Sequence, residues 1–156
     1  MNYDYTFNPE TQKVLYRLIE CKGYCPNESV GDYKEREDGS FDIYASDIGG
    51  KNEWYSRLIL IHELLEQIIT KFQKIPEPLI AAFDEFFCEL KKAGLVPEEQ
   101  NAGDHPWAPY KDAHQFIEEK PERDVATKLG IDFDVYMKDL DIYIDEMEAA
   151  NEATKS

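Results

Sequence analysis

The chain has 156 residues with 33 acidic and 17 basic side chains, which gives a formal net charge of −16 when the histidines are neutral. Such a chain lacks the positive surface that releases counterions from phosphates, so we expect no nucleic-acid partner and no binding to an anionic membrane. No apolar run approaches the roughly 20 residues of a membrane span, and no secretion signal is recognisable. These features predict a soluble, cytoplasmic protein.

The length and the aromatic content favour a single globular domain over residues 1–150, with residues 151–156 as a frayed C-terminal tail. The cysteines are Cys21, Cys25 and Cys88. An odd number of cysteines without a secretion signal predicts reduced thiols. Cys21 and Cys25 do not form a C-x-x-C pair, so a zinc or redox role for them is a weaker hypothesis than idle thiols.

The hydrophobic pattern predicts a mainly α fold of the α+β class. A first helix is expected over residues 9–22, because Asn8 and Pro9 have the form of a helix cap and apolar side chains follow at helical spacing. Two alternating segments joined by the turn EDGS predict a small β-hairpin near residues 33–46. The strongly apolar segment 51–74 predicts a central buried helix within a set of about five.

The remaining helices of that set follow in chain order. Their expected ranges are 78–94, 109–130 and 132–148. Pro121 should kink or break the second of them, because proline cannot donate a backbone hydrogen bond inside a helix. The loop over residues 95–109 is long and rich in turn residues, and long loops inside compact domains are often functional.

Two of the histidines share a pattern that points to metal chemistry. His62 is followed four residues later by Glu66, and His114 four residues later by Glu118. Four residues of α-helix turn the side-chain direction by only about 40°, so each pair lies on one helix face. This is the spacing at which two ligands from one helix reach a single metal ion.

The first pair lies at the edge of the most apolar surface of the predicted helix. A buried histidine or glutamate costs several kcal/mol unless it is paired or coordinated. A hydrogen bond between His62 and Glu66, or an ion pair of Glu66 with Arg57 or Arg17, would satisfy these groups without a metal. For an isolated H-x-x-x-E spacing, those are the simpler interpretations.

Glu63 strengthens the metal hypothesis. It directly follows His62 and gives H-E-x-x-E, which resembles the zinc-protease helix H-E-x-x-H with Glu66 in place of the second histidine. In the zinc proteases the inner glutamate is a general base on the metal-bound water, and this catalytic role is predicted for Glu63. Because of Glu66, a standard member of that class is not expected, and peptidase activity is a minority hypothesis.

His62, Glu66 and His114 together make a set of two imidazoles and one carboxylate. This set suits a catalytic zinc ion with an open water position, which is the first expectation, or an iron or manganese ion. Four acids are candidates for a further ligand or for orienting the ligands: Asp84, Asp104, Glu118 and Glu122. Asp84 could instead cap a helix or pair with a basic residue. His105 is expected to be a surface or pocket residue rather than a ligand.

The chain also resembles a family of small bacterial and phage-encoded proteins with no established activity. The resemblance rests on HELLE, FDEFF, AGDHPWAPY and ERDVATKLGIDFDVY, and it covers roughly residues 52–140. It implies a shared metal or catalytic centre, and it brings no substrate. The positions it carries over are His62, Glu63, Glu66, Asp84, Asp104, Tyr110, His114 and Glu122.

Three functional hypotheses follow. The first is a divalent-metal-binding protein, possibly a hydrolase. The second is an acidic binding module without enzymatic activity, such as a phage-type decoy for a basic partner, because residues 132–156 hold eight acids and two bases. The third is a structural domain in which the His–Glu pairs are internal hydrogen bonds. The substrate, the protein partner and the oligomeric state cannot be read from the sequence.

Overall fold

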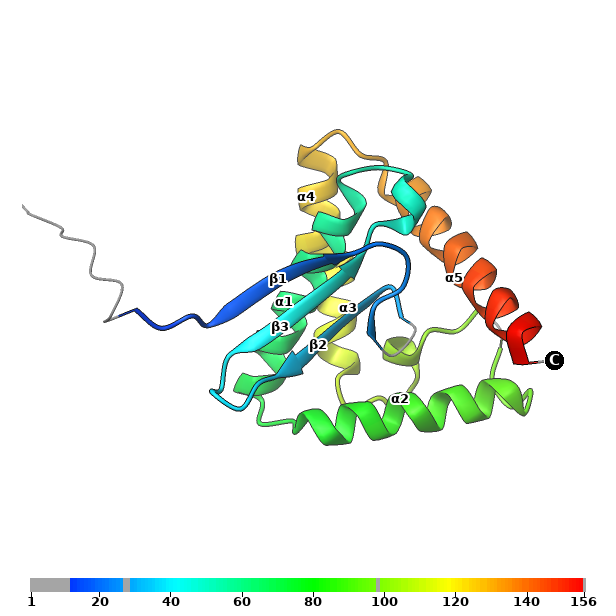
Figure 1. The fold of residues 1–156 in the computed structure, drawn as a ribbon, viewed down its shortest axis with the longest axis horizontal. Helices are drawn as coiled ribbons and strands as arrows, with labels where there is room; N and C mark the ends of the chain where they lie inside the picture. Colours follow the sequence, from blue (N-terminus) through cyan, green and yellow to red (C-terminus); the bar gives the residue numbers. More distant parts are fainter. Residues whose placement is uncertain (1–11, 27–28, 98, 156) are drawn as a thin grey trace, which may run out of the picture.

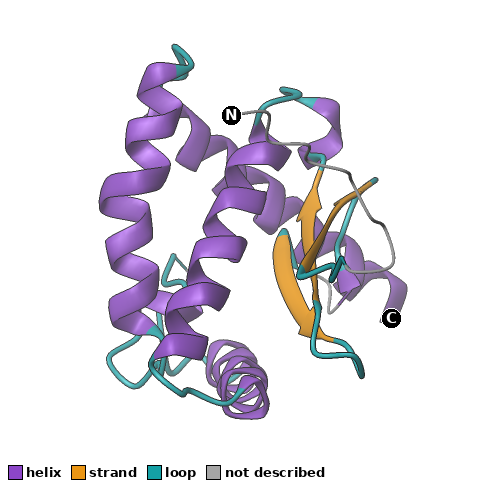
Figure 2. Cartoon of the chain, turned by 90° about the vertical axis from the view of Figure 1, so that its left-hand side faces the viewer, coloured by secondary structure: helices purple, strands orange, loops and turns teal. Residues whose placement is uncertain are grey.

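The computed structural model describes residues 12–26, 29–97 and 99–155. In these ranges the chain is mainly helical with one three-stranded sheet, which confirms the predicted α+β class. Figure 2 shows the strands on one side of the molecule and most of the helices on the other. The strands are β1 (Tyr16–Cys21), β2 (Gly31–Glu35) and β3 (Phe41–Ser46). The helices are α1 (Tyr55–Phe72), α2 (Glu77–Lys92), α3 (Lys111–Ile117), α4 (Arg123–Lys128) and α5 (Phe133–Lys155).

The predicted first helix over residues 9–22 is wrong where the structure describes it, because the chain there forms β1; residues 9–11 lie outside the described ranges. β1 pairs in parallel with β3, with Tyr16 opposite Phe41. Leu18, expected in a helical core, is 57% exposed. The apolar positions of this short segment fit the spacing of a strand as well as that of a helix. Pairing with β3 gives its backbone N–H and C=O groups the hydrogen bonds that they would otherwise make within a helix.

The predicted β-hairpin is confirmed. β2 and β3 are antiparallel, with Gly31 opposite Ala45 and Glu35 opposite Phe41, so the hairpin begins slightly earlier than expected. Gly39 in its turn has a φ of +76°, a left-handed conformation that glycine adopts without strain from a Cβ atom. The strand order is β1-β3-β2, and the central strand β3 is buried along most of its length.

α1 packs against β2 and β3 and also contacts α3 and the turn that follows α3, as the ribbon in Figure 1 shows. Leu58 and Ile59 are buried in the main core. The apolar stripe predicted for residues 51–74 is not buried throughout, because Trp54 is exposed and Phe72 at the C-terminal end is 87% exposed. The more detailed prediction of five helices around this central one is not confirmed.

α2 occupies most of the expected range 78–94 and forms a second core with the hairpin. Ile80 and Phe83 pack there with Tyr33 and Ile43. In Figure 1 α2 runs along the lower edge of the molecule, below the sheet and α3. This core holds the start of α3 close to α2.

Pro121 interrupts the helix predicted over residues 109–130, as expected. After α3, the segment Glu118–Glu122 forms one turn of π-helix, and α4 follows it directly. Proline lacks the N–H of the regular helical ladder and its ring crowds the preceding turn, so a wider turn accommodates it. The last residue of this turn, Glu122, is buried and faces α1.

α5 continues past the expected end at Glu148 and extends through most of the segment predicted as a frayed tail. Phe133, Tyr136 and Leu140 anchor its first half in the main core. Over the described ranges, every helix is too short or too polar to cross a membrane.

Candidate metal centre

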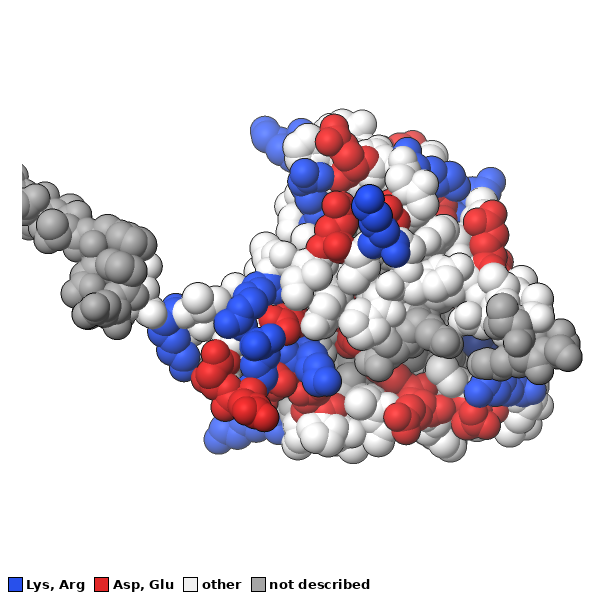
Figure 3. Space-filling model, in the orientation of Figure 1, with Lys and Arg blue, Asp and Glu red and all other residues white. Residues whose placement is uncertain are grey.

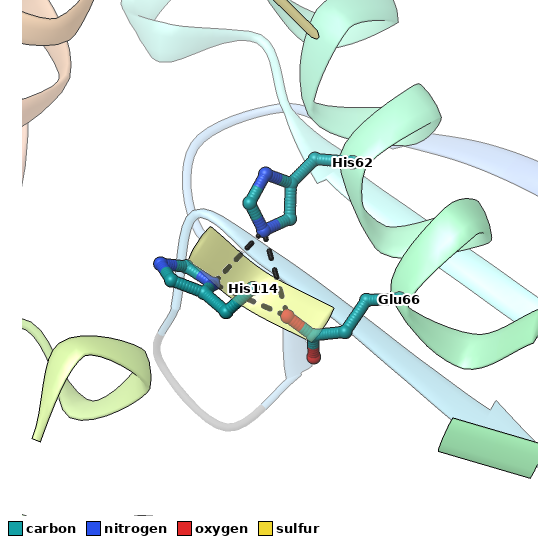
Figure 4. Close-up of side chains that lie close together, drawn as sticks. All are labelled: His62, Glu66 and His114. Atoms are coloured by element: carbon teal, nitrogen blue, oxygen red, sulfur yellow. Dashed lines mark hydrogen bonds and ion pairs between the residues drawn. The ribbon is translucent and has the colours of Figure 1, made fainter. Parts of the chain in front are cut away.

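Two histidines and a glutamate converge between α1 and α3 (Figure 4). His62 and Glu66 come from α1, one turn apart, and His114 comes from α3. The Nε2 atom of His62 lies 3.0 Å from Nδ1 of His114 and 3.5 Å from Oε2 of Glu66. The third side of this triangle, from His114 Nδ1 to Glu66 Oε2, is 3.2 Å. The structure thus brings together the three residues that the sequence had singled out.

The size of this triangle suits one small divalent ion. Zinc ligands bound at roughly 2.0–2.1 Å in a tetrahedron lie about 3.3 Å from one another. The three separations run from 3.0 to 3.5 Å, so the helices need not move to admit an ion. Without a metal ion, the contacts of His114 with His62 and with Glu66 are hydrogen bonds, and His62 and Glu66 form an ion pair.

Glu122 orients the ring of His62. The Nδ1 atom of His62 is 2.8 Å from Oε2 of Glu122, and the hydroxyl of Tyr136 donates a 2.7 Å hydrogen bond to Oε1 of the same carboxylate. Glu122 is only 3% exposed. A carboxylate on the far nitrogen fixes the tautomer of a metal-binding histidine and raises its basicity. Glu122, one of the predicted ligands, therefore acts here as the partner that directs His62 Nε2 to the centre.

The ion-pair partners of Glu66 are histidines rather than arginines. Glu66 is buried and meets His62 and His114. Arg57 instead lies over the ring of Trp54, and Arg17 approaches Asp42. The metal-free alternative with an arginine partner is therefore wrong, whereas Glu66 lies 3.5 Å from His62 and makes a 3.2 Å hydrogen bond with His114.

The charges of this cluster shift its protonation equilibria. Burial alone would lower the pKa of His62, but hydrogen bonds to Glu122 and Glu66 raise it well above 6.5. Burial raises the pKa of Glu66, yet its hydrogen bonds to His114 and His62 bring the net pKa below its ordinary value. The pKa of His62 is raised and that of Glu66 is lowered, and both shifts favour a protonated His62 beside ionised carboxylates.

Glu63, the predicted general base, follows His62 on α1 and packs toward β2. A Cβ atom at Gly31 would lie 2.3 Å from Oε1 of Glu63, so the absence of a side chain at Gly31 makes room for this carboxylate. Burial and the charge of Glu66 raise the pKa of Glu63 well above its ordinary value. The role of Glu63 as a general base stays a prediction.

Asp84 lies apart from the three candidate ligands. It accepts a 2.5 Å hydrogen bond from the hydroxyl of Tyr110 and belongs to neither group of potential ligands found among the described residues. Burial raises its pKa to about 6, with a further contribution from the charge of Glu66. The proposed role of Asp84 as a metal ligand therefore finds no support. The residue that contacts Asp84 directly is Tyr110, one of the positions named in the family resemblance.

Asp104 and Glu118 lie on the other side of His114. They form a second group with that histidine, in which one ligand atom from each residue lies within 4.8 Å of the others. Oε2 of Glu118 is 3.8 Å from Nε2 of His114. Burial raises the pKa of Glu118; His114 opposes this shift and the charge of Asp104 adds to it. Neither acid belongs to the group of His62 and Glu66, so their predicted role as a further ligand or as orienting residues stays a prediction.

His105, expected to be a surface or pocket residue rather than a ligand, is buried in an aromatic cluster and belongs to neither group of potential ligands among the described residues. Its ring lies 5.8 Å from Phe83 and 5.7 Å from Phe87, measured between centroids, and 5.3 Å from Trp107.

The three cysteines are free, and Cys25 is buried near the carbonyl of Val30.

Tyr136 also contacts the site, through Glu122, although the sequence patterns described above did not single it out. It lies on α5 in the main core. A fully buried tyrosine needs a hydrogen-bond partner for its hydroxyl, and this requirement was the available signal. The identity of that partner depends on how α4 and α5 fold back toward α1.

Comparisons with protein families, with curated proteins and with solved structures found no match to this chain. The resemblance noted from the sequence therefore stays a prediction.

Proposed function

We propose that this protein binds a divalent metal ion, zinc in the first place, and uses it for hydrolysis. The ligands are Nε2 of His62, Nδ1 of His114 and a carboxylate oxygen of Glu66. The observation that carries the proposal is the convergence of these atoms at 3.0 to 3.5 Å from one another, with Glu122 holding the far nitrogen of His62. Iron or manganese would suit the same ligand set.

The hydrolase part of the proposal follows from the number of ligands. Three protein ligands leave a position for water, and a zinc ion lowers the pKa of that water to roughly 7 and polarises a carbonyl or phosphoryl oxygen. Glu63 is the proposed general base. It lies about 60° from Glu66 around the axis of α1, on the side away from His62. Its raised pKa brings it closer to neutrality, where a base accepts and returns protons most effectively.

The metal-binding part is tested with Glu66→Gln. Elemental analysis of zinc-saturated, desalted wild-type protein is expected to give at least one equivalent of zinc, and Glu66→Gln to hold one equivalent less. An amide keeps the shape of the side chain, but a neutral amide is not among the usual zinc ligands, whereas a carboxylate is. Glu119→Gln is the matched control, because Glu119 is exposed and should be replaceable without loss of metal. A wild-type protein that retains no stoichiometric metal would contradict the proposal.

The catalytic part is tested with Glu63→Gln. This variant is expected to keep the zinc content of the wild type and to lose roughly 10²–10⁴ of any hydrolytic rate, because the amide cannot accept a proton. The assay compares peptide, ester and phosphoester substrates with the zinc-loaded protein and with the EDTA-treated protein. Hydrolysis that survives in zinc-loaded Glu63→Gln would remove Glu63 from the mechanism and leave the metal site intact.

The second hypothesis, an acidic binding module for a basic partner, has less support. On the face drawn in Figure 3, acidic and basic side chains are interspersed rather than gathered into one acidic surface. A mixed surface of this kind is typical of proteins whose charge serves solubility. We therefore favour the metal-dependent function.

A further inference from the structure

We infer that His114 serves two cation positions, one on each ring nitrogen, so that the centre binds a second divalent ion between His114, Asp104 and Glu118. This inference rests on the proposed function, because the first ion occupies the Nδ1 side of the same ring. The second position takes Nε2 of His114 and one carboxylate oxygen from each acid.

The placement of the ring is the first argument. Nδ1 of His114 faces His62 and Glu66, at 3.0 and 3.2 Å, whereas Nε2 faces Glu118 at 3.8 Å. The two nitrogens of an imidazole point away from each other, so one ring can bind an ion on each side without turning. Gly103 packs directly against this ring, since a Cβ atom there would lie 2.5 to 2.8 Å from three ring atoms. The ring is therefore held in the orientation that presents both nitrogens.

The second group is also assembled by the fold rather than by one helix. Asp104 is at the end of the short 3₁₀ turn Ala102–Asp104 before α3, and Glu118 begins the π-turn after α3. Gln115 donates a 3.4 Å hydrogen bond to Oδ1 of Asp104 and helps to hold that carboxylate beside α3. The three donor atoms lie within 4.8 Å of one another, and all three residues are only partly buried. Small rotations of the acids and bound water would complete the shell, as is usual for a site of one nitrogen and two oxygens.

Charge is the third argument. Glu66 lies on the Nδ1 side of the His114 ring and Glu118 on the Nε2 side, where it is grouped with Asp104, so carboxylates lie near both ring nitrogens. A divalent ion at the second position would place a charge of +2 beside the two carboxylates of Asp104 and Glu118.

The experiment titrates zinc into metal-free protein by isothermal calorimetry and counts bound zinc by elemental analysis. Wild type is expected to bind two ions, and Asp104→Asn and Glu118→Gln one ion each, with only the weaker step lost. Asp112→Asn and Glu119→Gln are the matched controls on exposed neighbouring positions, and they should bind two. These exposed or partly exposed replacements leave the cores untouched, and circular dichroism checks that each variant is folded.

The outcomes separate this inference from the proposed function. Glu66→Gln should lose the first ion and retain one at the second position. One ion in wild type, with the same content in Asp104→Asn and Glu118→Gln, would overturn the second position and leave the proposed function standing. No ion in any variant would overturn both.

The sharing of His114 has its own readout. Two Cu²⁺ ions joined by one imidazolate couple magnetically, so the electron paramagnetic resonance signal per copper should be weaker in dicopper wild type than in monocopper Glu118→Gln. A full signal from two bound Cu²⁺ ions would show that they do not share the ring, and would overturn the inference in this form.

Discussion

His62→Ala is expected to destabilise the metal-free protein by about 3 kcal/mol and to abolish zinc binding at the first position. The variant removes the partner of Glu122, a carboxylate that is 3% exposed and that would keep only the hydroxyl of Tyr136. Removing one member of a buried charge pair typically costs about 3–5 kcal/mol, because the remaining charge stays in a poorly solvated position. Urea denaturation in EDTA measures the loss.

A double variant tests the reason for that loss. In His62→Ala/Glu122→Gln the side chain at position 122 is neutral, so much of the stability should return while zinc binding stays absent. The single variant Glu122→Gln should bind zinc about 10–100-fold more weakly than the wild type, since the orienting carboxylate of His62 is gone. If the double variant is as unstable as His62→Ala alone, the cost arises from a packing defect and not from the orphaned carboxylate.

The stability of the metal-free protein is expected to fall as the pH rises above 6.5. The folded pKa of His62 is raised well above that value, so its contribution is complete below pH 6.5 and is lost as the pH rises through the folded pKa. Glu63, whose pKa is also raised in the fold, adds a loss in the same direction as it ionises beside Glu66. The contribution of Glu66 to stability depends on pH in the opposite direction. Its pKa is lowered in the fold, so its contribution is present above pH 4.5 and is lost as the pH falls through the folded pKa. Metal-free protein should therefore be most stable under mildly acidic conditions.

Zinc should reverse this trend. The ion competes with the proton on Nε2 of His62, so it binds more tightly as the pH rises, and a ligand that prefers the folded state stabilises it by mass action. Thermal unfolding measured across the pH range, once in EDTA and once with zinc, gives two curves that should diverge above neutrality. In EDTA, the stability of Glu63→Gln should fall less steeply with rising pH than the stability of the wild type. Metal-free stability that increases above pH 6.5 would contradict the assigned protonation of the cluster.

The helix of His62 and Glu66 was predictable because its signals are local and redundant. A long apolar segment at helical spacing predicts a buried helix, and the four-residue interval puts both side chains on one face whatever surrounds them. The break at Pro121 was predictable for a similar reason, because the ring of proline acts on its own turn. The ends of these elements were less predictable, as the extension of α5 to Lys155 shows.

β1 was not predictable by the same reasoning. In a segment of six residues, apolar positions fit a helix and a strand about equally well. Which of the two forms then depends on whether a neighbouring segment can accept and donate the backbone hydrogen bonds of a strand. That partner is β3, more than twenty residues further along the chain, with Tyr16 opposite Phe41. A parallel pairing of this kind leaves no local trace such as a tight turn.

The sequence by itself therefore determined which side chains of this protein are candidates for a metal site: two His–Glu pairs, each on one helix face because of its spacing. Only the tertiary structure decided how they are combined. The packing of α3 on α1 turned Nδ1 of His114 toward His62 and Glu66, and the π-turn at Pro121 carried Glu122 behind His62 rather than into the proposed ligand set. These relations join residues separated by about fifty positions or more, and no local rule of spacing specifies the distance between two helix faces.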